Sequence, residues 1–210
     1  MISNLTKIDL SQYKLVVFDL DGTLYNQKKM RKTMLLKLLS YYCLRPFRWF
    51  DLKIIDTFRR EREKLAFEKD MVNLQDLQYQ VCANKLNIEK EKVKKVIDQW
   101  ILNAPLPLLH KWVFPEIREF IKLLESHNIP IAVWSDYAAV EKIKAMNIDA
   151  DLIVSATDAQ IDKMKPNTTG LSYILSHFNC PPEKALMIGD RDELDGEAAR
   201  RMGVQYFQVV

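Results

Sequence analysis

The chain has 210 residues, 48% of them hydrophobic and 28% charged, which fits one globular domain, or one with an insertion, and excludes a disordered or fibrous chain. Its net charge of +3 is too small for a protein committed to binding nucleic acid. No apolar run approaches the ~18 residues that a membrane span needs, so we expect neither nucleic acid nor a membrane as a partner.

Five short apolar runs predict the strands of a parallel sheet. Each is bounded by polar residues, as is typical of strands that helices cover on both faces. The runs are Lys14–Asp19, Ile129–Trp134, Leu152–Val154, Ala185–Gly189 and Val204–Val209. Apolar residues at helical spacing precede the second and fourth runs, at 117–124 and 171–178. Alternating strands and helices predict an α/β protein with an open, Rossmann-like parallel sheet.

Residues 25–114, directly after the first predicted strand, carry a helical pattern instead. Apolar residues recur there at helical spacing, with little strand signal. The helical stretches are Met34–Leu39, Arg59–Asp70 and Val93–Ile101, and Pro105 and Pro107 mark the return of the chain. We therefore predict an α/β core of residues 1–24 and 115–210, interrupted by an α-helical insertion of residues 25–114.

The predicted insertion is also the basic part of the chain. It has 19 basic and 10 acidic residues, a net charge of +9, whereas the remainder has a net charge of −6. A basic segment of this kind can draw an anionic substrate toward an acidic site. The candidates to face such a site are Lys28, Lys29, Arg31, Lys32, Arg45, Arg48 and Lys69. For any single one of these residues we favour the alternative of a solvated helix face, because charge runs usually lie in solvent.

The segment Asp19–Leu24 (DLDGTL) ends the first predicted strand. Ligands of open parallel sheets bind beyond the carboxyl ends of the strands. Asp19 and Asp21 start on the same side of the strand and repel each other unless a proton or cation joins them, which points to a metal ion. Gly22 lets the chain turn there. The alternative is a plain Asp-Gly turn, whereas an EF-hand loop is excluded because Leu24 occupies the position that needs glycine.

Polar side chains also follow the next three predicted strands. Ser135 and Asp136 follow the second strand, Lys165 lies about ten residues after the third, and Asp190 and Asp195 follow the fourth. Singly, Ser135 and Asp195 can be helix caps and Lys165 a surface lysine. Together they predict one constellation at one edge of the sheet.

These segments resemble the four motifs of the haloacid dehalogenase (HAD) superfamily. The resemblance is carried by Asp19–Leu24, Ser135, Lys165-Pro166 and the stretch from Gly189 to Asp195, and the core segments cover about half the chain. The helical insertion after the first motif resembles the subclass of this superfamily that has a cap there. The resemblance implies a cap domain over a Rossmann-like core.

The resemblance further implies a Mg²⁺-dependent phosphatase that acts on a small phosphorylated metabolite. Asp19 would attack phosphorus and form an aspartyl-phosphate. Asp21 would act as general acid and then as base, and its backbone carbonyl would bind Mg²⁺. The side chains of Asp19 and Asp190 would be further ligands of the ion, and Asp195 would bind it or orient the others.

The remaining motif residues would hold the phosphate. Ser135 and Lys165 would bind phosphoryl oxygens, and Gly22 and Thr23 would complete the substrate site. Asp136 stands where the family often has Asn, and an ionised aspartate cannot donate a hydrogen bond, so its contact with phosphate is in doubt.

Two other functions remain compatible with the motifs. A phosphomutase of the same superfamily would use the same residues, and a non-catalytic binding or regulatory protein would keep the fold. Dehalogenases of the superfamily lack a second acid at the position of Asp21, so its presence favours a phosphatase or a mutase.

Cysteine usage and the start of the sequence bear on the compartment. Cys43, Cys82 and Cys180 are far apart, odd in number and never in a Cys-x-x-Cys arrangement, so we expect reduced thiols without a disulfide or zinc site. The first residues show no basic stretch followed by a long apolar one. We therefore expect a cytoplasmic protein.

Overall fold

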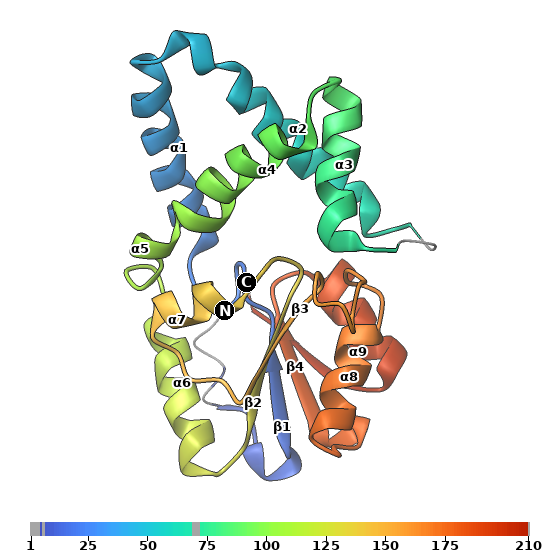
Figure 1. The fold of residues 1–210 in the computed structure, drawn as a ribbon. Coiled ribbons are helices and arrows are strands. Elements are labelled where there is room, and N and C mark those ends of the chain that lie inside the picture. Colours follow the sequence, from blue (N-terminus) through green and yellow to red (C-terminus); the bar gives the residue numbers. More distant parts are fainter. Residues whose placement is uncertain (1–4, 6, 69–71, 210) are drawn as a thin grey trace.

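A five-stranded sheet lies at the centre of the computed structural model, which describes residue 5, residues 7–68 and residues 72–209 (Figure 1). Neighbouring strands are parallel and follow the order β3-β2-β1-β4-β5. The strands are β1 (Leu15–Phe18), β2 (Ile131–Ser135), β3 (Leu152–Ser155), β4 (Ala185–Gly189) and β5 (Gln205–Gln208). The predicted open parallel α/β sheet is therefore confirmed.

Burial differs between the centre and the edges of the sheet. All residues of β1, β2 and β4 are buried, as their continuous apolar runs predict. The edge strand β5 instead exposes Gln205 and Gln208, and β3 has half-buried residues at its start. The expectation that every strand is buried on both faces is wrong for these two edges, because each has a neighbour on one side only.

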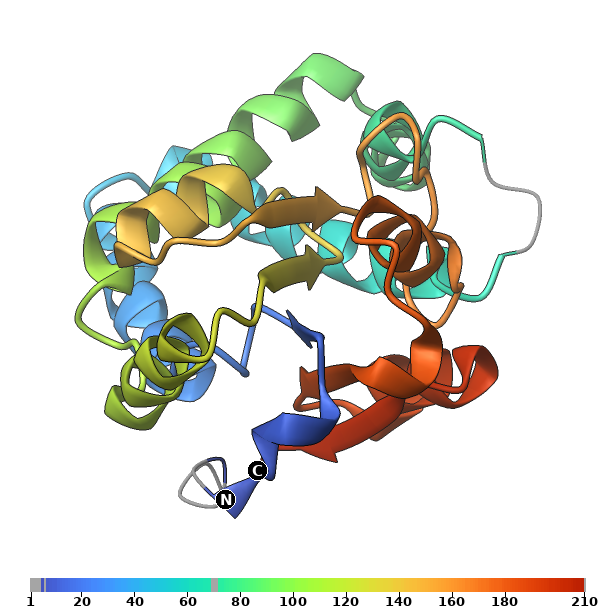
Figure 2. The same cartoon turned by 90° about the horizontal axis from the view of Figure 1, so that it is seen from below.

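Helices cover the two faces of the sheet (Figure 2), and alternate side chains of β1 pack against them. On one face, Val16 and Phe18 pack in a cluster with residues of α6 (Pro115–Ser126) and α7 (Val140–Met146). On the other, Leu15 and Val17 pack with residues of α8 (Thr169–His177) and α9 (Glu197–Met202). The period of two along a strand therefore divides the core into two layers.

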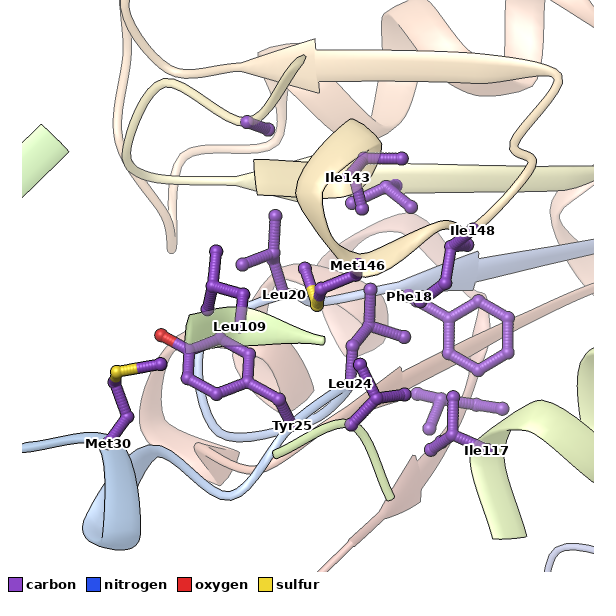
Figure 3. Close-up of a cluster of buried hydrophobic side chains, with 14 of the residues drawn as sticks. Phe18, Leu20, Leu24, Tyr25, Met30, Leu109, Ile117, Ile143, Met146 and Ile148 are labelled. Atoms are coloured by element: carbon purple, nitrogen blue, oxygen red, sulfur yellow. The ribbon is translucent and has the colours of Figure 1, made fainter. Parts of the chain in front are cut away.

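The first of these clusters continues from the sheet to the base of the helical segment. Figure 3 shows Phe18 of β1 next to Ile117, and Leu20 and Leu24 of the following loop among the same apolar side chains. Met30 from the start of the first long helix joins them. The core and the base of the inserted helices therefore share one apolar interior.

All regular elements that the structure describes between residues 26 and 112 of the inserted segment are helical, and turns and loops join them. Its elements are α1 (Gln27–Cys43), a 3-10 helix (Pro46–Arg48), α2 (Phe50–Leu65), α3 (Leu74–Leu86), α4 (Lys90–Ile97), a π-helix (Asp98–Asn103) and α5 (Leu106–Leu109). Figure 1 shows these helices beyond one end of the sheet. Among the described residues, no helix combines the length and apolar composition needed to cross a bilayer.

The chain leaves the core and returns to it at adjacent points. Tyr25 and Val113 form an isolated antiparallel bridge. Next to it, the Phe114 amide donates to the Leu24 carbonyl at 3.2 Å and the Asn26 amide donates to the Trp112 carbonyl at 2.8 Å. The two ends of the inserted segment are thus held side by side, while the domain boundaries at 24/25 and 114/115 stay a prediction.

Several predicted helices have different bounds in the structure. Only residues 59–65 of the stretch predicted over Arg59–Asp70 belong to α2, which starts earlier at Phe50 and ends at Leu65, and residues 69 and 70 lie outside the described residues. The pattern predicted over Val93–Ile101 is an α-helix that continues as a π-helix from Asp98. Pro105 and Pro107 lie at a one-turn helix rather than in an extended linker, because proline fits the first turn of a helix.

Candidate active site

The polar segments predicted to meet do meet beyond the carboxyl ends of the strands. Asp19 follows β1 and Asp190 follows β4, which lies next to it in the sheet. The strand order runs from β1 toward β2 and β3 on one side and toward β4 and β5 on the other. These segments therefore meet at the point where the strand order reverses, the usual position of ligands in open α/β sheets.

Lys165 is the central cation of this site. Its Nζ lies 2.6 Å from Asp19 Oδ1 and 2.7 Å from Asp195 Oδ1, and its side chain is 1% exposed. Burial by itself lowers the pKa of Lys165, but Asp19 and Asp195 more than offset this effect and raise the pKa above its usual value. The alternative of a surface lysine is therefore wrong, and Lys165 is a buried positive charge held between two carboxylates.

Asp19, Asp190 and Asp195 form a cluster of carboxylates. One oxygen from each lies within 4.8 Å of the others. Burial and the negative charge of Asp19 raise the pKa of Asp190 to about 6. Burial also raises the pKa of Asp195, because Lys165 offsets only part of the cost of its charge. Three carboxylates that share one lysine leave an excess of negative charge.

The carboxylate cluster fits a hard divalent cation. Asp190 Oδ1 is buried and has no hydrogen-bond partner among the described residues. Carboxylate oxygens in a small group are the ligands that Mg²⁺ prefers, and a buried oxygen without a donor is an available ligand. The alternative of Asp195 as a helix cap is wrong, since its carboxylate accepts from Lys165 and from the Arg191 amide, and Gly196 precedes α9.

Glycine is required at two points of the backbone around this cluster. Gly22 has φ +116°, and a Cβ built there would lie 2.2 Å from Asp190 Oδ2. A Cβ at Gly189 would lie 2.4 Å from Asp195 Oδ2. Any side chain at Gly22 or Gly189 would displace a carboxylate, so the close approach explains both glycines.

Asp21 has a separate set of partners. Lys142 Nζ donates to its two carboxylate oxygens at 2.7 and 2.6 Å, and the Tyr25 hydroxyl donates to Oδ1 at 2.5 Å. Burial by itself raises the pKa of Asp21, but Lys142 and the Tyr25 hydrogen bond together hold it below its usual value. Asp21 is therefore an ionised carboxylate beside the cluster, and its side chain does not belong to that cluster.

Lys142 is a site residue that the sequence reasoning missed. It lies in α7, a short helix that was not predicted, and its side chain is only 8% exposed. A single lysine in a charged stretch carries no motif. The sequence signal that could have revealed α7 was Asn147, because asparagine often adopts the left-handed conformation that ends a helix, as it does here.

The second-motif residues support the site through the backbone. Ser135 is buried, and its Oγ accepts from the Tyr137 amide at 3.1 Å. Asp136 Oδ1 accepts from the Lys165 amide at 2.9 Å, so this aspartate holds the loop that carries the central lysine. An accepting carboxylate suits that contact, which gives a physical reason for Asp at this position.

Thr23 also contacts Asp19 directly. Its hydroxyl donates to Asp19 Oδ2 at 3.0 Å, and the side chain is fully buried. Asp19 is therefore held by Thr23 on one oxygen and by Lys165 on the other. Such fixed orientation suits a carboxylate that must meet a reacting atom in line.

Arg62 of α2 connects the inserted helices to the edge of the site. Its guanidinium donates to the Asp136 carbonyl and lies 3.9 Å from the centre of the Tyr137 ring. Its Nε donates to Gln78 Oε1 of α3 at 2.8 Å, and the residue is 2% exposed. Arg62 was not among the basic residues predicted to face the site.

The predicted basic candidates lie elsewhere. Lys28, Lys29, Arg31 and Lys32 are exposed on α1, which fits the alternative of solvated helix faces. Arg45 and Arg48 lie against the Tyr41 ring, and Lys69 is outside the described residues.

The fold and the acidic site define a hydrolase of the HAD class. The profile of the haloacid dehalogenase-like hydrolases matches residues 16–209, nearly the whole chain. The chain therefore belongs to this family, which confirms the resemblance carried by its motifs. A comparison with curated proteins finds no matching sequence.

Solved structures share the fold at low sequence identity. A 2-haloacid dehalogenase from Pseudomonas syringae pv. Tomato DC3000 has a TM-score of 0.63 and 18% identity, covering 93% of this chain and 86% of that one. A HAD phosphatase from Thermococcus onnurineus has a TM-score of 0.62 and 17% identity, covering 94% and 86%. A HAD-family hydrolase from Bacillus subtilis bound to magnesium has a TM-score of 0.63 and 14% identity, covering 94% and 88%.

Proposed function

We propose that this hydrolase is a Mg²⁺-dependent phosphatase that cleaves a small phosphate monoester through an aspartyl-phosphate. The observation that carries the proposal is the pairing of two acids with separate environments. Asp19 is held by Lys165 and Thr23 inside the carboxylate cluster, whereas Asp21 lies beside it with Lys142 and Tyr25. One carboxylate is thus placed to attack and a second to move protons.

The chemistry proceeds in two steps. Asp19 forms a bond to phosphorus while the bond from phosphorus to the ester oxygen breaks, and Asp21 gives that oxygen a proton. Asp21 then takes a proton from water, which attacks phosphorus and releases Asp19. Phosphoryl transfer depends mainly on positioning and on neutralising the equatorial oxygens, a task suited to Lys165 and the Ser135 hydroxyl.

Asp21 needs a proton for the first step only. The ionised form that Lys142 and Tyr25 stabilise is the one that accepts a proton from water. A negatively charged phosphate bound nearby raises the pKa of a neighbouring carboxyl. Substrate binding therefore favours the protonated form of Asp21 in the step where an acid is required.

The Mg²⁺ would be held by the carboxylates of Asp19 and Asp190, by Asp195 directly or through the orientation it imposes, and by the Asp21 backbone carbonyl. When bound, the ion would neutralise negative charge on the phosphoryl oxygens. The unpartnered Asp190 Oδ1 supports this assignment. A magnesium-bound structure with the same fold adds support.

We further propose that residues 25–114 form a cap that covers the site and selects a small phosphorylated metabolite. Arg62 and the start of α3 support this role, because both contact loops at the carboxyl edge of the sheet. The cytoplasm is the proposed compartment, in keeping with three free cysteines.

A dehalogenase is the main alternative that the structural comparisons raise. In that reaction Asp19 would attack carbon and displace halide, which requires no proton for the leaving group. Lys142 and Tyr25 both donate hydrogen bonds to the Asp21 carboxylate, and this support favours a reaction that uses the second acid.

Hydrolysis of p-nitrophenyl phosphate tests the proposal. We expect turnover that requires Mg²⁺, stops with a chelator, and falls by at least about a thousandfold in Asp19→Asn and Asp21→Asn. Asp192→Asn, an exposed acid of the same region that pairs with Arg200, is the matched control and should keep activity. Full turnover in Asp19→Asn would exclude the aspartyl-phosphate.

Two further measurements separate the rival functions. Labelled water should place its oxygen in the released phosphate for a phosphatase, whereas a mutase would release little labelled phosphate. Halide release from 2-haloacids without any phosphatase activity would favour the dehalogenase. A broad panel of phosphorylated metabolites that gives no turnover would favour a non-catalytic protein.

A further inference from the structure

The turn between α1 and α2 is the end of the inserted segment farthest from the sheet (Figure 1). Large apolar side chains in this turn and on the adjoining part of α1 are exposed. We call this group the apical surface. It consists of Leu35, Leu36 and Leu39 on α1, of Leu44, Phe47 and Trp49 in the turn between α1 and α2, and of Phe50 at the start of α2. Leu44 is 80% exposed, Phe47 82% and Trp49 59%. Exposed apolar groups of this size mark interaction sites.

The apolar side chains of α1 lie on two sides of the helix. Met30, Met34 and Tyr42 are buried against the rest of the molecule. Leu35 and Leu39, one turn apart, lie on a different side together with Leu36 and face solvent. A helix with one covered and one uncovered apolar side has more apolar surface than its own fold buries.

The stretch of chain that carries the apical surface has charged residues of a single sign. From residue 22 to residue 50 the chain contains seven basic residues and no acidic one. The basic residues are Lys28, Lys29, Arg31, Lys32, Lys37, Arg45 and Arg48. The next acid, Asp51, is buried and bonded to Arg48 Nε at 3.0 Å. The surface therefore suits a partner that is both apolar and negatively charged.

A lipid surface meets both conditions. Leu, Phe and Trp enter the boundary between headgroups and acyl chains, while Lys and Arg reach the anionic headgroups. A second copy of the chain would bring like charges together, and a nucleic acid would leave the leucines unmatched. We propose that the apical surface docks on an anionic bilayer. This peripheral contact needs no spanning helix and goes beyond the proposed phosphatase activity.

Flotation of the whole protein with vesicles tests the proposal. We expect binding to phosphatidylcholine vesicles that contain about 30% phosphatidylglycerol, and little binding to phosphatidylcholine alone. High salt should weaken the binding, because the basic residues contribute through charge. Lys32→Glu with Lys37→Glu should reduce it at least about tenfold.

Matched apolar variants locate the contact. Leu44→Ser with Phe47→Ser should reduce binding to the anionic vesicles at least about tenfold. Phe67→Ser, which removes an equally large and 72% exposed side chain after the other end of α2, should leave it unchanged. Thermal unfolding followed by circular dichroism verifies that each variant folds.

Three results would overturn the proposal. One is failure to float with the anionic vesicles, and another is equal loss in Phe67→Ser and in the Leu44 and Phe47 variant. The third is a lipid-free dimer that disappears in the Leu44 and Phe47 variant, which would assign the surface to a second copy of the chain.

Discussion

Two buried lysines neutralise two aspartates that are two positions apart in the sequence. Lys165 contacts Asp19 at 2.6 Å and Lys142 contacts Asp21 at 2.6 Å. The ion pairs with Lys165 and Lys142 therefore offset the repulsion between Asp19 and Asp21 for which the sequence suggested a metal ion or a proton. The lysines come from distant segments, so each ion pair also ties loops of the core together.

Lys142→Met should destabilise the protein. It removes one partner of a buried ion pair and leaves Asp21 without its cation, which costs about 3 kcal/mol. Lys142 helps to hold the pKa of Asp21 below its usual value. The loss of stability should therefore be largest when the pH is above the usual pKa of an aspartate, and it should shrink as the pH falls. Urea unfolding at pH 7 measures the loss.

Lys144→Met is the matched control for this variant. Lys144 lies in the same helix, is 67% exposed and pairs with Glu141. Its removal should cost less than about 0.5 kcal/mol, since exposed ion pairs contribute little. Equal effects of the two substitutions would contradict the role assigned to Lys142.

The carboxylate cluster should make stability depend on pH. The pKa of Asp190 is raised to about 6 in the folded protein. Its favourable contribution to the free energy of unfolding is therefore complete when the pH is below the pKa that Asp190 has in the unfolded chain, and it is lost as the pH rises through 6. Without metal, Tm should fall by about 2–4 °C between pH 5 and 8, allowing for partial solvent screening. Mg²⁺ should reverse this fall above pH 6.

Asp190→Asn isolates that contribution. The variant should show a smaller fall of Tm with pH and less stabilisation by Mg²⁺, whereas Asp192→Asn should behave like the parent protein because Asp192 is exposed. Scanning calorimetry at several pH values makes the comparison. An unchanged response to Mg²⁺ in Asp190→Asn would remove this residue from the metal site.

At the scale of elements, the apolar runs predicted the strands because buried parallel strands show continuous apolar sequence. The helices α3 and α7 were not predicted. In α3, polar Gln78 is buried beside Tyr79, so the apolar pattern is broken. The informative signals were at the ends, where Asn87 and Asn147 adopt the left-handed conformation of a C-cap.

The contact between α2 and the core depends on a buried guanidinium. Arg62→Lys should fail to replace it, because an ammonium cannot stack on Tyr137 and donate to both the Asp136 carbonyl and Gln78. We expect a stability loss of about 2–3 kcal/mol, and faster amide exchange in the loop after β2. Hydrogen exchange measured by mass spectrometry tests this.

Arg59→Lys provides the control, since Arg59 is exposed on the same helix. Its amide exchange should match that of the parent protein. A loop after β2 that remains equally protected in Arg62→Lys would show that α2 does not stabilise it.

For the whole molecule, the sequence was sufficient for the parallel α/β fold and for the residues that meet at its carboxyl edge. The sheet topology fixes the ends of β1 and β4, so Asp19, Asp190 and Asp195 were expected at one edge, and Lys165 reaches them from the loop after β3. The orientation of the inserted helices was not predictable, because their charged residues have no period that separates inward from outward. Arg62 faces the core, whereas Lys28 and Lys32 face solvent.

The paired crossing at Tyr25 and Val113 has an evolutionary consequence. Because the inserted segment starts and ends at the same place, its length imposes no tension on the sheet. Helices can be exchanged, lengthened or rebuilt between these two points while the aspartates stay in register. The proposed cap can therefore acquire new substrate preferences while the carboxylate cluster stays unchanged.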